Sequence, residues 1–374
     1  MKLPNINKPY HLKDYKFSLV MTVVTLSIIG ILVIGSAKKA VQGKQIIGLI
    51  LGLIVMVVVS LVDYAWVLNF YWILYAVNIV MLLFTRFFGT AHNNAQRWID
   101  LKVFQFQPSE MTKLLMILFF AKFLMRHEED LNTFKTIVSA VLLLAPSLML
   151  ILIQPDLSTT ISIALVFCVL MYLAGLSYKF IGTLLAIMIP TALIFILIVI
   201  QPNQKLIEPY QQTRILAWLY PEKYASDEAF QQTNSIMAIG SGQLKGKGLN
   251  NNTTTSVKNG NFILEPQTDF IFAIVGEELG FVGCCIVIGL LLLIVIQCII
   301  IGMKAQDLSG RIICCGIAAQ VAIQSFINIS VATGIFPNTG IPLPFVSYGL
   351  TSLLTMFLGI GVVLNVGLQP KKYQ

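Results

Sequence analysis

The sequence predicts an all-α polytopic membrane protein with about ten transmembrane helices and a large loop before the eighth. Of its 374 residues, 57% are hydrophobic and 11% are charged, whereas soluble domains carry about 25% charged residues. The mean hydropathy is +0.82. Apolar runs of about 18 or more residues recur, and each is long enough to cross a ~30 Å hydrocarbon core as a helix.

Ten such runs follow one another along the chain. The first begins after a Lys-rich stretch without a small-residue cleavage site, so we expect a retained helix rather than a secretory signal. The whole chain, 1 to 374, forms a single membrane domain, with tails at 1 to 15 and 368 to 374 and a large extracytoplasmic loop at 201 to 266. The predicted spans are 16–35, 46–63, 66–85, 108–125, 136–153, 158–175, 180–200, 270–301, 312–334 and 346–367.

The distribution of Lys and Arg predicts the orientation. An even number of spans places both termini on one side of the membrane. If that side is cytoplasmic, it holds twelve of the 25 Lys and Arg residues, against six in the short loops of the other side. Cytoplasmic loops carry the excess of Lys and Arg, and loops of about 60 residues escape this rule. Both termini are therefore predicted to be cytoplasmic.

The net charge of +8 does not indicate a nucleic-acid partner. In a membrane protein, basic residues serve as orientation signals and attract anionic membrane lipids. The six cysteines lie in apolar runs without metal-ligand spacing, so we interpret them as small hydrophobic residues. They are Cys168, Cys284, Cys285, Cys298, Cys314 and Cys315.

Polar residues gather toward the predicted outer side in four segments, which is the pattern of a site built between helices. The first contains "NAQRWIDL" and "FQPSEMTK", residues 94 to 113. Pro108 suits the first turn of a helix, and Ser109 and Glu110 suit the positive end of its dipole. Lys113 lies one turn beyond Glu110. It either pairs with Glu110 or forms a cationic site for a phosphate or pyrophosphate with Arg97.

Two further segments have plainer interpretations. "QPDLSTT", residues 154 to 160, is typical of a capped helix start, with Asp156 and Ser158 serving the first turn. "GIFPNTGIPLPFVSYG", residues 334 to 349, predicts a break in helical structure because it carries Pro337, Pro342 and Pro344. Broken helices in membranes are tolerated mainly where they line protein or a cavity.

The large loop contains "AIGSGQLKGKGL", residues 238 to 249. The spacing of Gly242 and Gly246 and the glycine after Lys247 do not fit a nucleotide-binding P-loop. The glycines allow backbone N–H groups to converge on an anion, with Lys245 and Lys247 adding charge. A flexible glycine turn with solvated lysines is the equal alternative.

The stretch "EPQTDFIFAIVGEELGFVG", residues 265 to 283, carries three carboxylates in an apolar run. On one helix, Asp269 and Glu277 are separated by a rise of about 12 Å. That exceeds the roughly 5 to 9.5 Å between paired glycosidase carboxylates, so a hydrolase using this pair is disfavoured. Glu277 and Glu278 point about 100° apart, so we expect one to pair with a cation and the other to face water or a polar cavity. Asp269 is either a helix cap or a catalytic group.

Together these motifs resemble the SEDS family (shape, elongation, division and sporulation), over residues 16 to 367. The quoted segments carry the resemblance, together with "NSIMAIGSGQLKGKGL". It implies ten transmembrane helices and a peptidoglycan glycosyltransferase of the bacterial cytoplasmic membrane that uses lipid II, the lipid-linked disaccharide-pentapeptide. It also implies a class B penicillin-binding protein as the partner transpeptidase. "AQRWI" is more similar to the RodA branch than to the FtsW branch.

The resemblance assigns the essential aspartate of the family to Asp269. It also implies a substrate-binding role for the matching residues Arg97, Trp98, Gln107, Ser109, Glu110 and Lys113. The chain departs from the family pattern at Ser158, Leu350, Thr351 and Gln243, and the last departure weakens a backbone-nest role for the glycine loop.

Glycosidic bond formation from a lipid pyrophosphate requires a base for the acceptor hydroxyl and cations for the leaving pyrophosphate. Asp269 is the candidate base, and a divalent cation, Mg²⁺ or Mn²⁺, is a candidate cofactor. The further candidate substrate contacts are Arg214, Ser241, Lys245, Lys247, Glu277, Glu278, Pro344 and Ser347. The alternatives are a lipid II flippase and a scaffold without catalysis. A flippase needs polar residues through the bilayer depth, whereas this chain concentrates them at one end.

Overall fold

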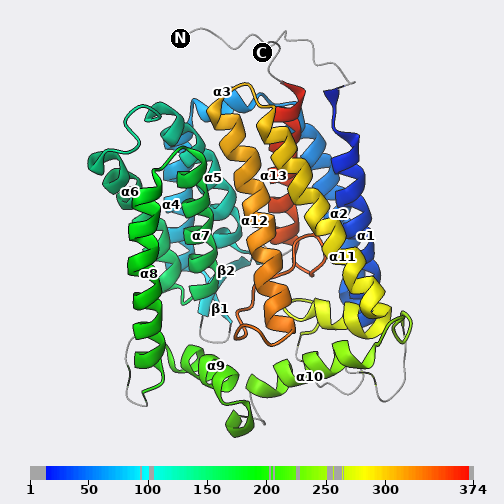
Figure 1. Cartoon of the computed structure of the whole chain (residues 1–374). Helices are drawn as coiled ribbons and strands as arrows, with labels where there is room; N and C mark the ends of the chain where they lie inside the picture. The colour runs from blue at the N-terminus through cyan, green and yellow to red at the C-terminus, as the bar shows by residue number, and fades with distance from the viewer. Residues whose placement is uncertain are drawn as a thin grey trace.

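The computed structural model describes residues 14–92, 95–100, 105–201, 204, 207–224, 228–250, 256, 263 and 265–369. Within this part of the chain, ten long helices coincide with the ten predicted spans (Figure 1). Seven of the described helices meet the length and hydropathy of a membrane span. The chain is therefore a polytopic membrane protein, as predicted. The ten helices are α1 (Phe17–Ala37), α2 (Lys39–Ser60), α4 (Tyr71–Phe88), α5 (Pro108–Arg126), α6 (Phe134–Ile153), α7 (Leu157–Leu173), α8 (Tyr178–Val199), α11 (Ile271–Met303), α12 (Leu308–Ala332) and α13 (Leu350–Leu368).

The first and last of these helices share one end of the bundle. α1 begins at the end of the bundle where α13 ends (Figure 1). The Lys16 side chain packs beside Gly367. We call this the terminal end, and the opposite end, where α9 and α10 lie, the loop end. The start of the first span and the end of the last therefore share one end of the bundle. The cytoplasmic placement of the two termini stays a prediction.

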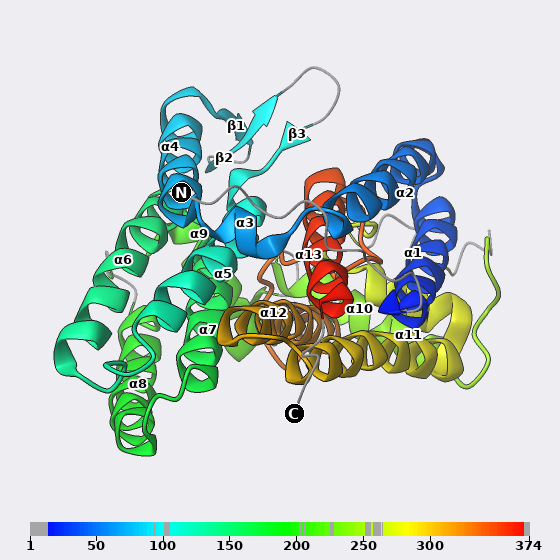
Figure 2. The same ribbon diagram turned by 90° about the horizontal axis from the view of Figure 1, so that it is seen from above.

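Helix α12 lies between α7 and α11 and packs against α5, α7, α11 and α13 (Figure 2). α13 in turn packs closely against α2. Gly52 of α2 faces the ring of Phe357, and Gly361 of α13 faces the backbone of Met56. Small residues allow helices in a membrane to approach closely, which is how this pair gains its packing contacts.

The connection between α4 and α5 departs from the all-α prediction. It holds three short antiparallel strands in the order β1-β2-β3. They are β1 (Thr90–His92), β2 (Ala95–Asp100) and β3 (Gln105–Phe106). Strand pairing satisfies the backbone polar groups of a connection that returns to the edge of an apolar bundle, where lone N–H and C=O groups are costly.

The segment predicted as a large loop also contains helices. α9 (Pro209–Leu219), the 3₁₀ helix η2 (Pro221–Tyr224) and α10 (Glu228–Ser241) lie at the loop end, with α10 packed across α11 (Figure 1). The signals for α9 are local. Pro209 occupies the first helical position, and the side chain of Gln211 accepts a hydrogen bond from the Glu208 N–H at 3.3 Å. A further short helix, α3 (Tyr64–Leu68), lies at the terminal end.

Candidate active site

Asp269 lies in the turn immediately before α11, at the loop end, and its side chain is partly exposed. Helix α11 begins at Ile271, and its N-cap position is Phe270, without a side-chain cap. The interpretation of Asp269 as a helix cap is therefore wrong. Its carboxylate remains available for another role.

Two side chains hold the backbone around Asp269. The Asn328 amide donates to the carbonyl oxygens of Asp269 at 2.9 Å and of Ile341 at 2.8 Å. The Ser347 hydroxyl donates to the Thr268 carbonyl oxygen at 2.7 Å and accepts from the Leu343 N–H at 2.8 Å. The turn before α11 is thus fixed from α12 and from the segment 334 to 349.

The segment 334 to 349 is non-helical, as its prolines predicted. Gly340 has φ of 72°, a conformation that favours glycine, and a Cβ placed on it would lie 3.6 Å from Oδ2 of Asp269. Pro344 is buried, and the next residue, Phe345, has φ of 64°. This segment therefore forms one wall beside the Asp269 carboxylate.

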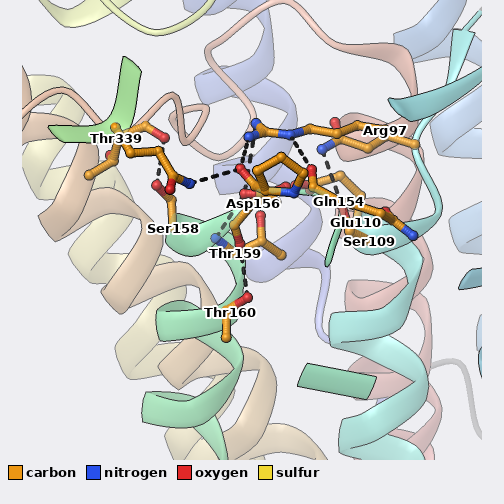
Figure 3. A network of polar contacts seen from close by, with 12 residues as sticks. Arg97, Ser109, Glu110, Gln154, Asp156, Ser158, Thr159, Thr160 and Thr339 are labelled. Carbon is orange, nitrogen blue, oxygen red and sulfur yellow. Dashed lines mark hydrogen bonds and ion pairs between the residues drawn. The ribbon is translucent and has the colours of Figure 1, made fainter. Parts of the chain in front are cut away.

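Arg97, in β2, reaches the turn that joins α6 to α7 (Figure 3). Its guanidinium donates to the carbonyl oxygens of Gln154, at 3.0 Å from Nε, and of Pro155. It lies 4.0 Å from the carboxylate of Asp156. The Gln211 amide of α9 also donates to Pro155, at 3.2 Å, so three parts of the chain meet here.

The start of α7 links this turn to the wall beside Asp269. Asp156 caps the helix by accepting the Thr159 N–H at 3.2 Å, as predicted. Ser158 does not serve the first turn; its hydroxyl donates to the Thr339 carbonyl oxygen at 2.7 Å (Figure 3). Because Thr339 precedes Gly340, this hydrogen bond connects the start of α7 to the wall beside Asp269.

The electrostatics of Asp269 follow from this placement. Burial raises the pKa of its carboxyl group above the ordinary value, Arg214 of α9 lowers it, Glu265 raises it, and Arg97 lowers it to a smaller extent. The net direction is upward. A carboxylate with a raised pKa beside two arginines is suited to accept a proton near an anionic group.

Lys113 and Glu110 form a buried ion pair at the start of α5, with 2.6 Å between Nζ and Oε1. Their side chains are 1% and 3% exposed. Of the two alternatives for Lys113, pairing with Glu110 is what the structure contains. Next to the pair, Gln107 donates its amide to the Ser109 hydroxyl at 3.1 Å.

The glycine loop is not an anion nest. Lys247 and Gly248 donate their N–H groups to the carbonyl oxygens of Glu277 and Glu278, both at 2.9 Å. These carbonyls are exposed by a break in α11 at Gly280, where φ is 66° and ψ is −165°. The loop therefore replaces the helical hydrogen bonds that the break removes.

The two glutamates are both buried, each 1% exposed. Glu277 pairs with Lys247 at 2.8 Å, which confirms the expected cation partner. Glu278 accepts a hydrogen bond from Ser36 of α1. Of the two environments expected for the other glutamate, water or a polar cavity, water does not apply to Glu278, because it is buried and contacts α1.

The remaining candidates are spread over the loop end. Lys245 is exposed, the Ser241 hydroxyl donates to the Ala238 carbonyl oxygen at 2.8 Å, and Trp98 is partly buried. In the described ranges, no three His, Cys, Asp or Glu side chains are grouped to hold a metal ion.

Sequence reasoning missed Asn328 and Gln154. Asn328 is 1% exposed in α12, and Gln154, 1% exposed, donates to the Leu82 carbonyl oxygen at 3.0 Å. A buried amide within a membrane span, such as Asn328, or at its end, such as Gln154, is costly unless it has partners, so both positions carried a usable signal.

Fold and site together define a polytopic membrane protein with a polar site at one end, which contains the Asp269 carboxylate, Arg97 and Arg214. Residues 11–372 match the family model described as "Cell cycle protein", which covers FtsW, RodA and SpoVE. The chain belongs to this family, the SEDS family.

Named relatives and solved structures agree with this membership. The chain is 34% identical over 355 residues to the peptidoglycan glycosyltransferase MrdB of Escherichia coli K12, covering 93% of this chain and 92% of that protein. It is 31% identical over 379 residues to the probable peptidoglycan glycosyltransferase FtsW of Geobacter sulfurreducens, covering 96% and 97%.

Among solved structures, the chain matches one chain of a peptidoglycan synthase complex that coordinates polymerization and crosslinking. The TM-score is 0.78, with 27% identity, 94% of this chain and 97% of that chain covered. It shares the fold of Thermus thermophilus RodA, with a TM-score of 0.68, 24% identity, and 96% and 98% covered.

Proposed function

We propose that this protein is a peptidoglycan glycosyltransferase that polymerises lipid II, with Asp269 as the general base. The observation that carries the proposal is the placement of Asp269: a partly exposed carboxylate at the loop end, facing Gly340, with its pKa raised by burial and lowered by Arg214 and Arg97. Family membership and the names of the relatives support the activity.

The proposed step is a displacement at the anomeric carbon of the donor sugar. Asp269 takes the proton of the acceptor 4-hydroxyl, the oxygen forms a β-1,4 bond to that carbon, and the bond to the lipid pyrophosphate breaks. The acceptor proton ends on the Asp269 carboxyl group. The electron pair of the broken bond leaves with the pyrophosphate.

Cations stabilise the charge that develops on the pyrophosphate. Arg97 and Arg214 are the proposed first contacts, because both act electrostatically on Asp269. Lys113 contributes only if substrate draws it from Glu110, and the exposed Lys245 reaches the phosphates only if the substrate extends over the glycine loop. A requirement for Mg²⁺ or Mn²⁺ is tested by adding a chelator to the polymerisation assay.

The site lies at the loop end, which the Lys and Arg distribution predicts to be extracytoplasmic. The expected partner is a class B penicillin-binding protein, and the RodA branch is the expected placement within the family. The match to a peptidoglycan synthase complex supports a partnered enzyme.

The test supplies purified lipid II to the protein together with its cognate transpeptidase. Glycan polymer is measured for the wild type and for Asp269→Ala. We expect polymer from the wild type and none from the variant. Equal polymer from both overturns the assignment of the base.

Two further outcomes separate the alternatives. If neither protein forms polymer but reconstituted vesicles transport lipid II across the bilayer, the flippase alternative replaces the proposal. If wild type and variant are both inactive in polymerisation and in transport yet still bind the transpeptidase, the scaffold alternative replaces it. The concentration of polar site residues at one end of the bundle favours the polymerase.

A further inference from the structure

A groove at the terminal end lies outside the proposed active site. It is formed where α1 begins and where α11 and α13 end, and its lining includes Lys16, Gln297, Ile300, Lys304 and Val366. These helix ends lie at the terminal end, opposite the start of α11, which Asp269 immediately precedes (Figure 1). The proposed polymerisation chemistry therefore does not use this groove.

Two lysines supply the charge of the groove, and among the residues that the structure describes no carboxylate lines it. Across the described ranges, neither Lys16 nor Lys304 has a carboxylate within ion-pair distance. Asp307, three residues beyond Lys304, is engaged elsewhere. It accepts hydrogen bonds from the Tyr64 hydroxyl at 3.0 Å and from the Gly310 N–H at 2.7 Å.

The groove is amphipathic along its length. Gln297 donates its amide to the Thr22 hydroxyl at 3.1 Å, and its buried Oε1 accepts no hydrogen bond from the described residues. Ile300 and Val366 provide apolar walls, and Ile300 is 45% exposed on the side of α11. Charge at the mouth and apolar surface beside it match a molecule with an anionic head and a hydrocarbon tail.

We infer that this groove binds an anionic phospholipid, with its phosphate between Lys16 and Lys304 and an acyl chain along the apolar wall of α11. Basic pockets between transmembrane helices bind anionic lipid headgroups in this manner. Free phosphate would pair with the lysines but would leave the apolar wall uncovered. A phospholipid pairs with the lysines through its phosphate and covers the wall with its acyl chain.

The test measures lipid retained by the purified full-length protein, using native mass spectrometry after incubation with equal amounts of phosphatidylglycerol and phosphatidylcholine. The wild type is expected to retain phosphatidylglycerol preferentially. Lys16→Gln/Lys304→Gln is expected to lower that preference by about tenfold or more, because each lysine near an anionic headgroup contributes to binding.

The matched control is Lys135→Gln/Lys179→Gln, which removes the same charge from exposed positions at the same end. It is expected to retain the wild-type preference. An equal loss in the control overturns the site, because the preference then reflects net charge alone. An unchanged preference in the Lys16/Lys304 variant also overturns it.

A second variant separates the lipid from free phosphate. Ile300→Trp keeps both lysines and fills the apolar wall, so it is expected to reduce retention of phosphatidylglycerol. Millimolar inorganic phosphate is expected not to displace the lipid from the wild type. Displacement by phosphate, together with normal retention in Ile300→Trp, would show an anion site without a lipid groove and would contradict the inference.

Discussion

Asn328 holds the backbone of Asp269: its side-chain amide donates to the Asp269 carbonyl oxygen at 2.9 Å and to the Ile341 carbonyl oxygen at 2.8 Å. One buried residue of α12 thereby joins the turn before α11 to the segment that carries Gly340. The position of the Asp269 carboxylate relative to the segment 334 to 349, which forms the wall beside it, depends on these two hydrogen bonds.

Asn328→Ala should lower polymerisation by about 10²-fold, because small misplacement of a catalytic group carries penalties of this size. It should also destabilise the protein by about 1 to 3 kcal/mol, since two buried carbonyls lose a donor. The control is Gln320→Ala, which removes another buried amide of α12 whose side-chain partners are Gln324 and Met356. Similar losses of activity in both variants, measured at equal folded fraction, would contradict a positioning role for Asn328.

The pH dependence of the reaction should report the environment of Asp269. A general base is active when deprotonated, and burial raises the pKa of Asp269, so the acid limb of kcat/KM should lie above the ordinary aspartate range. Arg214→Gln removes a charge that lowers this pKa and should move the limb to higher pH. Glu265→Gln should move it to lower pH.

The measurement is the initial rate of polymerisation from pH 4 to 9 or so, across the range where a shifted carboxyl group titrates. Lys223→Gln, which removes an exposed cation of η2, is the control and should leave the limb in place. A shift of the acid limb to lower pH in Arg214→Gln would contradict the proposal that Arg214 lowers the pKa of Asp269.

The buried pair of Glu110 and Lys113 should behave asymmetrically. Glu110→Gln leaves a lysine that is 2% exposed without its carboxylate, and breaking such a pair costs about 3 to 5 kcal/mol. Glu110→Leu/Lys113→Met removes both charges and should restore most of the melting temperature. If Lys113 also contacts the pyrophosphate, as proposed, the double variant should remain deficient in polymerisation. Full recovery of activity would assign the pair to stability alone.

Gly280 should tolerate no side chain. Its φ of 66° and ψ of −165° fall in a region essentially restricted to glycine, and an added Cβ would meet the backbone nitrogen of Gly246. Gly280→Ala should lower the melting temperature in detergent strongly, with a cost above about 3 kcal/mol. Gly289→Ala in the same helix meets no atom within 4 Å and should be neutral or slightly stabilising. Equal melting temperatures of Gly280→Ala and Gly289→Ala would contradict the account in which the glycine loop packs tightly against the break in α11.

The sequence predicted the ten long helices because each depends on a local apolar run. It also predicted the start of α5 at Pro108 and the cap at Asp156, which follow from local chemistry. The helices of the segment 201 to 266 were missed because their apolar content is modest, although Pro209 and Gln211 signalled α9.

Partners across the fold were harder to predict. The hydrogen bond from Ser158 to Thr339 and the bond from Asn328 to Asp269 join residues far apart in the chain. The glycines of residues 238 to 249 suggested an anion nest because their composition fits one. Only the break at Gly280 explains why their N–H groups bind the carbonyls of α11 instead.

The most direct test of the central claim is the polymerisation rate of Asp269→Asn, which keeps the shape of the side chain and removes the base. Glu222→Gln makes the same change at an exposed position of η2 and serves as the control. General-base catalysis contributes about 10² to 10⁴-fold, so the rate of Asp269→Asn should fall by that factor while Glu222→Gln stays at the wild-type rate. A rate for Asp269→Asn within about twofold of wild type would contradict Asp269 as the general base.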